Sequence, residues 1–166
     1  MIAIRGRNTL VLTHRRQLLD KWVARLQTFL DIPPDQIGVI HGAKKKPTGS
    51  IDLALVQSLF HNGVVADLVA NYGHVVVDEC HHLSPVGFEA IAREVRAQYL
   101  LGLSATATRK DGHHPIIFMQ CGPVRHRVDA RTQAAARPFD YKVVSRWTEF
   151  QLIRNDPEQK PAIQDI

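Results

Sequence analysis

The stretch Val75-Val76-Val77-Asp78-Glu79-Cys80-His81-His82 decides how this sequence folds, because an apolar run ends abruptly in two carboxylates and two histidines. Such a short run of β-branched residues predicts a buried strand, at residues 74–78. A second apolar run, at residues 99–103, ends in Ser104-Ala105-Thr106, and a helix-like segment lies between the two runs. Two strands that each end in polar residues and are joined by a helix predict the polar edge of a parallel α/β sheet.

The rest of the chain alternates strands and helices in the same way. Apolar patterning predicts further strands at residues 9–13, 37–41 and 51–56, and helices at residues 15–30, 64–72 and 84–96. Ser84-Pro85 would start the last of these helices as an N-cap and a first-turn proline. We also expect a basic loop at residues 42–50, a short helix at 115–121 and a late strand at 139–145. The alternation predicts an α/β fold with a mostly parallel sheet that has helices on both faces.

Length and composition suit one globular domain. The chain has 166 residues, of which 45% are hydrophobic and 22% are charged, and this length can bury a sizeable core. No apolar run approaches the roughly 20 residues that span a bilayer, and no signal peptide opens the chain, so we expect no membrane partner and a cytoplasmic location. The formal net charge of +5 modestly favours a polyanionic partner such as DNA or RNA.

The cysteines and histidines could in principle bind a metal ion. Cys80 and Cys121 are the only cysteines, too few for a disulfide framework, so reduced buried thiols are expected. With neighbouring histidines they could supply zinc ligands, but the chain has no C-x-x-C pair and no H-x-x-x-H on a helix, which disfavours zinc. A metal-dependent hydrolase that uses Asp78, Glu79 and His81 directly is an alternative.

Asp78 and Glu79 are the candidate catalytic residues. Hydrolysis of a phosphoanhydride needs a magnesium ion to neutralise phosphate charge and a carboxylate to orient the attacking water. Adjacent residues at a strand end splay apart, so one can face the metal while the other faces the water. A polar turn at a strand end would explain the pair equally simply. The following His81 and the downstream Ser104-Ala105-Thr106 favour the catalytic interpretation.

In order and spacing, these motifs resemble motifs II and III of superfamily 2 helicases of the DEAD/DEAH class. Because residues 108–112 follow the second motif, the chain is most similar to the type III restriction and XPB-like group. The resemblance implies the first RecA-like lobe of an ATP-dependent helicase or translocase, with ATP and Mg²⁺ as cofactors in the complete protein. It also implies that DNA or RNA is a partner.

The resemblance also implies roles for individual residues. Asp78-Glu79-Cys80-His81 is similar to the D-E-x-H box, in which Asp78 would hold the magnesium ion through water and Glu79 would activate the nucleophile. His81 would then link the nucleotide site to the next motif. Ser104, Ala105 and Thr106 match the S-A-T motif, which implies a coupling of the ATP state to the grip on nucleic acid.

Two further segments imply nucleic-acid contacts. Residues 9–19 are similar to motif Ia, where Thr13, His14 and Arg15 would contact the phosphate backbone. Residues 51–59 resemble a later contacting segment through Gln57, although this chain lacks the usual threonine before that glutamine. The run Lys44-Lys45-Lys46 is read as solvated surface in preference to a phosphate contact.

The sequence contains no G-x-x-x-x-G-K-[ST] phosphate loop, and helicase motifs IV to VI are also missing. Residues 2–8 look like the end of the helix that follows such a loop. We therefore expect a RecA-like sheet incomplete on its N-terminal side, with residues 1–146 as a partial ATP-binding lobe and residues 147–166 as a polar tail or linker. Alone, the chain should have little ATPase activity, should need the missing helicase segments in cis or trans, and could self-associate. A non-catalytic nucleic-acid-binding or scaffold module is an alternative.

Overall fold

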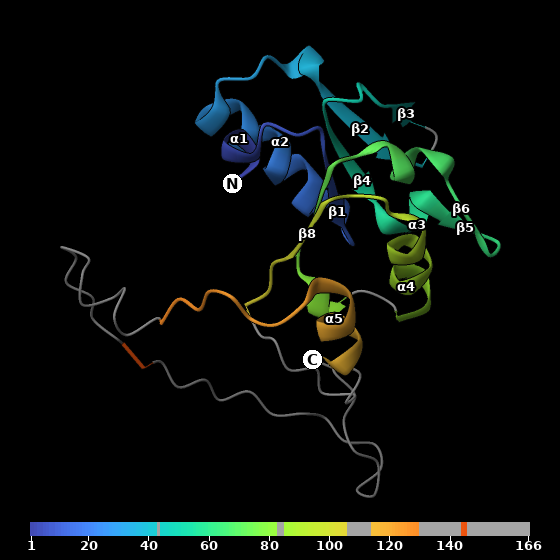
Figure 1. Cartoon of the computed structure of the whole chain (residues 1–166). Helices are drawn as coiled ribbons and strands as arrows, with labels where there is room; N and C mark the ends of the chain where they lie inside the picture. The colour runs from blue at the N-terminus through green and yellow to red at the C-terminus, as the bar shows by residue number, and fades with distance from the viewer. Residues whose placement is uncertain (43, 83–84, 106–113, 130–143, 146–166) are drawn as a thin grey trace, which may run out of the picture. The chain divides into compact units, whose positions relative to one another are not determined.

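A computed structural model of the chain describes residues 1–42, 44–82, 85–105, 114–129 and 144–145 (Figure 1). The chain divides into one unit of residues 1–125 and another of residues 126–166, and the first unit holds every helix and strand given below. The predicted late strand falls outside the described residues except for its last two positions. The boundary predicted after residue 146, and the polar tail, fall wholly outside them and stay predictions.

Six strands form one sheet in the order β3-β2-β4-β1-β7-β8. The strands are β1 Thr9–Thr13, β2 Ile37–His41, β3 Lys44–Lys46, β4 Ile51–Leu55, β7 His74–Val77 and β8 Tyr99–Gly102. All neighbours pair in parallel except β2 and β3, which are antiparallel. The predicted α/β class with a mostly parallel sheet is confirmed.

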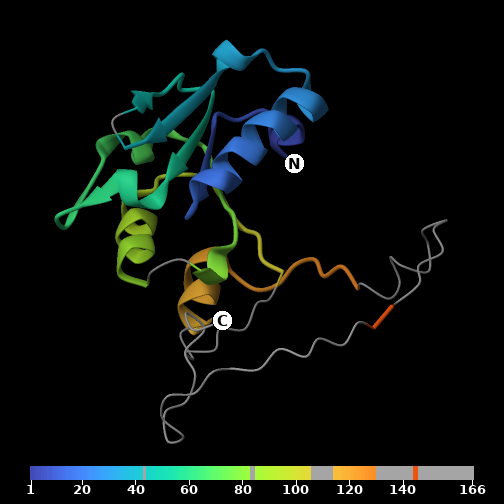
Figure 2. The ribbon, with the colours of Figure 1, turned by 180° about the vertical axis from the view of Figure 1, so that it is seen from behind.

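Helices lie on both faces of this sheet, as Figures 1 and 2 show from opposite sides. The α-helices are α1 Ile2–Arg5, α2 Arg16–Leu30, α3 Val56–Leu59, α4 Pro85–Glu94 and α5 His114–Cys121, and the 3-10 helices are η1 Pro34–Gln36, η2 Asp67–Asn71 and η3 Cys80–His82. Within the part of the chain that the structure describes, none of these helices has the length and apolar character needed to cross a bilayer.

Alternate residues of the central strands pack on opposite faces, because successive side chains of a strand point to opposite sides. On one face, Leu10, Leu12, Val75 and Val77 pack with α3, η2, α4 and α5. On the other face, the intervening strand residues pack with α1 and α2, through buried and half-buried side chains that include Val11, Val76, Leu19, Trp22 and Leu26. Both core layers depend on the strand register that brings β1, β4 and β7 together.

Two predicted elements were wrong. The lysine run expected in a loop is the antiparallel edge strand β3, and its side chains are exposed, so its charge is compatible with an edge position. Residues 64–72, expected as one helix, instead form β6 Val64–Val65 followed by η2, and β6 pairs with β5 Phe60–His61. Asn62 and Gly63, with φ of 50° and 80°, supply the hairpin turn that such a dipeptide favours.

Smaller differences concern element ends. α4 ends at Glu94 and not at Arg96, and α5 begins one residue earlier than expected. The predicted N-cap Ser84 lies outside the described residues. α2 ends where predicted, because Asp31 adopts a left-handed φ of 53° before the two prolines at 33 and 34.

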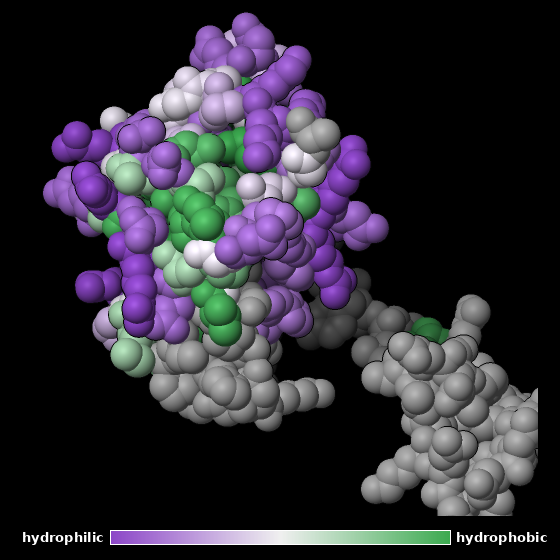
Figure 3. Space-filling model, turned by 90° about the vertical axis from the view of Figure 1, so that its right-hand side faces the viewer, coloured by the Kyte–Doolittle hydropathy of each residue, from purple (hydrophilic) through white to green (hydrophobic). Residues whose placement is uncertain are grey.

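Apolar side chains are exposed on several elements, including Phe29 of α2, Val64 of β6, Val86 of α4 and Met119 of α5. Figure 3 views the side that carries β3 and the β5–β6 hairpin, where apolar residues gather inside a polar rim. Elsewhere, a groove of about 280 Å³ lies between α2 and the β8 end of the sheet, lined by residues that include Trp22, Phe29, Val76, Leu101 and Leu103. Among the described residues, nothing pairs with the outer edge of β8, so the sheet is open on that side.

Candidate functional site

The acidic motif begins directly after β7 and is tied to the strands on either side. The amide of Asp78 donates to the Leu12 carbonyl at 2.9 Å, and the amide of Cys80 donates to the Leu103 carbonyl at 3.0 Å. Between them Glu79 takes a left-handed φ of 48°, which turns the chain sharply into η3. Because β1, β7 and β8 run parallel and in register, this turn holds both carboxylates at the carboxyl edge of the sheet.

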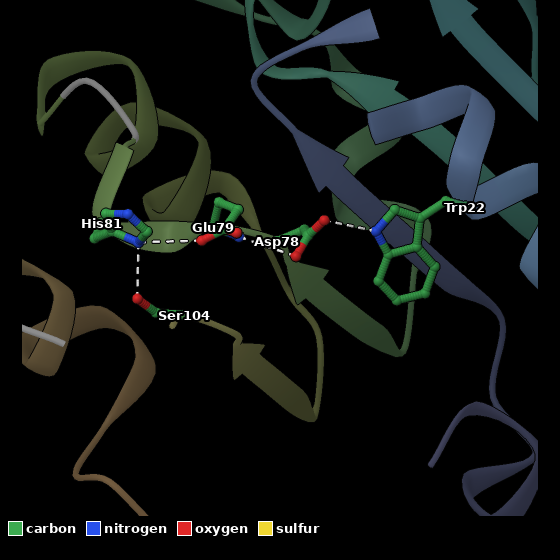
Figure 4. A network of polar contacts seen from close by, with 5 residues as sticks. All are labelled: Trp22, Asp78, Glu79, His81 and Ser104. Carbon is green, nitrogen blue, oxygen red and sulfur yellow. Dashed lines mark hydrogen bonds and ion pairs between the residues drawn. The ribbon is translucent and has the colours of Figure 1, made fainter. Parts of the chain in front are cut away.

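Asp78 has a donor on each carboxylate oxygen (Figure 4). Its Oδ2 accepts a hydrogen bond from the indole Nε1 of Trp22 at 2.8 Å, and its Oδ1 accepts one from the Glu79 amide at 3.1 Å. Each oxygen retains a further lone pair, since a carboxylate oxygen can accept two hydrogen bonds. The carboxylate is therefore fixed in orientation and can still receive a water molecule or a cation.

Glu79 points away from Asp78 and toward His81. Its Oε2 is buried and has no hydrogen-bond partner among the described residues, although His81 Nδ1 lies 3.3 Å away. The same ring nitrogen lies closer to Ser104 Oγ, at 2.7 Å. One ring nitrogen carries at most one proton, so it cannot donate to Glu79 while it accepts from Ser104. We take the Ser104 contact as the hydrogen bond because it is shorter, which leaves Glu79 Oε2 as an acceptor in need of a donor.

The contact of His81 with Ser104 thus joins the acidic motif to the segment that follows β8. Ser104 and Ala105 follow β8 directly and are exposed, whereas Thr106 lies outside the described residues. The roles implied for these residues stay predictions.

The residues predicted to bind nucleic acid lie at the same edge. Gln57 Nε2 donates to the His14 carbonyl at 3.1 Å, so α3 contacts the β1–α2 turn. Arg15 and Gln57 are exposed, His14 is half-buried, and Thr13 is buried. The Thr13 side chain does not reach the surface, so only the backbone of this residue could contact a nucleic acid.

A row of histidines connects this turn to the acidic motif. The rings of His14 and His82 lie 5.0 Å apart, and those of His82 and His81 lie 4.0 Å apart. Burial lowers the pKa of His14, and the neighbouring charges of His82 and Arg15 lower it further. The lowered pKa favours the neutral His14 ring, whose buried Nδ1 has no hydrogen-bond partner among the described residues.

Two cysteine sulfurs lie behind the site, beside Gly102. A Cβ atom on Gly102 would lie 3.0 Å from the Sγ of Cys121 and 3.2 Å from the Sγ of Cys80. Both thiols are free. Burial raises the pKa of Cys80, and burial with the nearby Cys80 raises the pKa of Cys121 to about 12. Glycine at position 102 is what leaves room for both sulfurs.

The carboxylates suit a magnesium ion that keeps most of its own water. Among the described residues, no group of three or more His, Cys, Asp and Glu side chains is arranged to hold a metal ion. Magnesium in phosphate-processing sites is commonly bound through one or two carboxylates, with water and phosphate completing its shell. A fixed Asp78 and the unpartnered oxygen of Glu79 fit that arrangement.

Sequence reasoning missed Trp22 as a member of this site, because it predicted only a helix at residues 15–30 and no polar contact from that helix to the acidic motif. The signal was available in part, since a buried tryptophan needs an acceptor for its indole N–H. The acceptor lies 56 residues further along the chain, so the partner could not be read from local spacing.

Comparison with known proteins gives a consistent result. A family model described as "Type III restriction enzyme, res subunit" matches residues 2–109. The DNA 3'-5' translocase XPB2 of Sulfurisphaera tokodaii is 28% identical over 135 residues, which cover 81% of this chain and 29% of that protein.

Two solved helicase structures share the fold. The Hef helicase domain of Pyrococcus furiosus aligns with a TM-score of 0.57 and 21% identity, covering 73% of this chain and 28% of that one. The UvsW helicase from bacteriophage T4 aligns with a TM-score of 0.56 and 14% identity, covering 69% and 42%. This chain spans 20% to 36% of the length of the eight curated relatives that it matches.

Proposed function

Because this chain belongs to the type III restriction enzyme, res subunit, family and forms the N-terminal RecA-like lobe of a superfamily 2 helicase, we propose that it serves ATP-dependent movement along, or unwinding of, nucleic acid. One observation carries the proposal. Asp78 and Glu79 lie at the carboxyl edge of the sheet, and His81, beside Glu79, contacts Ser104 at the end of the next strand. Two carboxylates placed in this way suit a magnesium ion and the orientation of an attacking water in phosphoanhydride hydrolysis.

The roles follow from the geometry of each side chain. Asp78, held by two donors, would bind the magnesium ion through water, and that ion would neutralise phosphate charge. Glu79 has a buried oxygen without a donor among the described residues, which suits an acceptor for the attacking water. His81, between Glu79 and Ser104, would transmit a change at one to the other.

Binding of ATP needs more than these residues supply. The sequence holds no phosphate loop with its lysine, and that loop normally cradles the β- and γ-phosphates. We propose that further helicase segments, in cis or in trans, provide it. The open edge of β8 and the adjacent apolar groove support this proposal, since both would be covered by an added strand and helix. The same surface would promote self-association of the chain alone.

For the nucleic acid we propose DNA, because the Sulfurisphaera tokodaii relative is named as a DNA translocase. The contacts would come from the β1–α2 turn, where Arg15 and Gln57 are exposed beside His14. Lysine and arginine side chains neutralise backbone phosphates and release counterions, so such binding weakens steeply as salt is raised.

Binding and turnover measurements on the 166-residue chain test both halves of this proposal. We expect DNA to bind with a Kd of about 1–100 μM, and Arg15→Ala to weaken this binding. Arg96→Ala is the matched control, since this exposed arginine lies three residues before β8, at the amino edge of the sheet. Equal weakening by both variants, or stronger binding to RNA of the same sequence, would contradict the proposed DNA-binding edge.

For the nucleotide, we expect ATP and magnesium to bind more weakly than about 100 μM, or about −5.5 kcal/mol, and turnover to be negligible. Isothermal titration with the wild type and Asp78→Asn would measure this, with Asp67→Asn as an exposed acidic control. Tight binding that survives Asp78→Asn would place the nucleotide somewhere else. Magnesium-dependent hydrolysis of substrates without a nucleotide would favour the direct metal hydrolase.

A further inference from the structure

We propose that Trp22 is a positioning residue that holds the Asp78 carboxylate in the orientation a divalent cation needs. This inference rests on the proposed function, which makes Asp78 the cation-binding carboxylate. It adds a residue from the middle of α2 to the site. The contact itself is a hydrogen bond of 2.8 Å from Trp22 Nε1 to Asp78 Oδ2 (Figure 4).

The indole ring is anchored by the core. Trp22 lies on the same stripe of α2 as the buried Leu19 and Leu26, and its ring belongs to the core layer that includes Val76 and Leu103. A ring held by packing on one side of the sheet has few rotamers available. The direction of its N–H is therefore set by the fold, and this direction is toward the end of β7.

The second donor to Asp78 comes from a different element. Oδ1 accepts from the Glu79 amide, which moves with the acidic turn, whereas Oδ2 accepts from α2. Two donors from two elements fix the plane of the carboxylate, because rotation about its terminal bond would break both hydrogen bonds. With Trp22 Nε1 removed, only the local amide would remain, and the carboxylate could rotate.

This matters because a cation bound through water depends on where the carboxylate oxygens point. Residues that orient a metal ligand without touching the metal commonly change metal affinity about tenfold or more when they are replaced. A backbone carbonyl would have satisfied the indole N–H equally well as a structural contact. The fold instead directs it to the carboxylate at the sheet edge, and this choice of acceptor indicates a positioning role.

Nuclear magnetic resonance of the indole N–H groups tests the contact without any metal. The chain has two tryptophans, Trp22 and Trp147, so the spectrum of Trp147→Phe identifies the signal of Trp22. We expect Asp78→Asn to shift the Trp22 Hε1 signal. If the Trp22 signal does not respond, the contact is absent and the inference is overturned, whatever the proposed function.

Manganese, a paramagnetic substitute for magnesium, tests the consequence. We expect Mn²⁺ to broaden the Trp22 Hε1 signal, and Trp22→Phe to weaken Mn²⁺ binding about tenfold, measured from free Mn²⁺ by electron paramagnetic resonance. Phe29→Leu, at an exposed position of the same helix, is the control. A benzothienylalanine at position 22 keeps the ring shape and removes only the N–H, so it covers the case in which Trp22→Phe folds poorly.

The outcomes separate this inference from the proposed function. Unchanged Mn²⁺ affinity in both position-22 variants would overturn the positioning role while leaving the cation site in place. A wild-type chain that binds no Mn²⁺, yet whose Trp22 signal responds to Asp78→Asn, would overturn the cation site itself, and the positioning role with it. Loss of affinity in both variants with a responsive Trp22 signal would support both.

Discussion

Two carboxylate regions lie at opposite edges of the same sheet, and they differ in how completely their oxygens are satisfied. Asp52, near the amino end of β4, is fully buried and accepts hydrogen bonds from the Tyr72 hydroxyl, the Thr48 amide and hydroxyl, and the Gly49 amide. Glu79, at the carboxyl edge, has a buried oxygen without a donor among the described residues. The Asp52 oxygens therefore have almost no capacity to accept a further hydrogen bond, whereas one Glu79 oxygen still has it.

The difference teaches how to separate a structural carboxylate from a chemical one. Burial alone does not separate the two kinds, because Asp52 is more buried than Glu79. Burial raises the pKa of Asp52, but the hydrogen bonds from Tyr72, Thr48 and Gly49 outweigh it and leave the pKa lowered. Burial raises the pKa of Tyr72, and the hydrogen bond from its hydroxyl to Asp52 raises it further. A carboxylate whose oxygens are all engaged by its own fold stabilises that fold, and one with a free oxygen is available for substrate.

The largest expected effect comes from removing the structural carboxylate. Asp52→Ala leaves the buried Tyr72 hydroxyl, the Thr48 hydroxyl and the Thr48 and Gly49 amides without their acceptor, and should lower the free energy of unfolding by about 4 kcal/mol. Asp78→Asn should change it by less than about 1 kcal/mol, because the amide oxygen can still accept from Trp22. Urea denaturation followed by circular dichroism measures both. Similar losses from the two variants would break the comparison.

Glycines beside the two regions should differ in the same direction. A Cβ on Gly38 would lie 2.7 Å from Asp52 Cγ and 2.8 Å from the Thr48 nitrogen, whereas one on Gly102 would meet the sulfurs of Cys121 and Cys80 at 3.0 Å and 3.2 Å. We expect Gly38→Ala to destabilise the chain by about 3 kcal/mol and Gly102→Ala by about 1–2 kcal/mol. Chemical denaturation tests the order. Adding Cys121→Ala should restore part of the loss at Gly102 and none of the loss at Gly38.

The pH dependence of stability should report mainly on Asp52. Its pKa is lower in the folded chain than its ordinary value, so its contribution is fully present above the unfolded pKa of about 3.9 and is lost as pH falls through the folded pKa. Below about pH 4 the wild type should therefore lose stability more steeply than Asp52→Asn. Urea midpoints between pH 7 and pH 3 would show this, with the exposed Asp35→Asn as a control that keeps the wild-type slope. Parallel curves for the wild type and Asp52→Asn would contradict it.

The smallest expected effect has the opposite sign. Glu79 holds a left-handed φ of 48°, a conformation that disfavours a non-glycine residue by about 1 kcal/mol or more. Glu79→Gly should thus stabilise the chain by about 1 kcal/mol. Asp31→Gly, at the end of α2 with a φ of 53°, is a matched control that should gain a similar amount. A loss of stability in Glu79→Gly alone would mean that its carboxylate has a structural role after all.

Much of the sheet edge could be predicted because its signals are local. A strand that ends in polar residues can be recognised within a few positions, so β7 and β8 were found, whereas the link from His81 to the next motif was implied by the family resemblance. Asp52 accepts a hydrogen bond from Tyr72, and Asp78 accepts one from Trp22 on α2. Such contacts depend on the folded arrangement of segments far apart in sequence. The β5–β6 hairpin was missed for another reason. Asn62-Gly63 is a local turn signal, but the apolar spacing of residues 64–72 was interpreted as a helix.

The position of β1 also sets the order in which this sheet can form. Thr9 pairs with Ile51 on one side and with His74 on the other, so the central strand is synthesised before both of its partners, which lie far along the chain. Pairing over such separations is slow, because long loops must close before their contacts stabilise anything. The carboxyl edge, which also needs β8, is therefore the last part to be assembled. During synthesis on the ribosome, β1 should stay exposed to chaperones until the chain has passed the acidic motif.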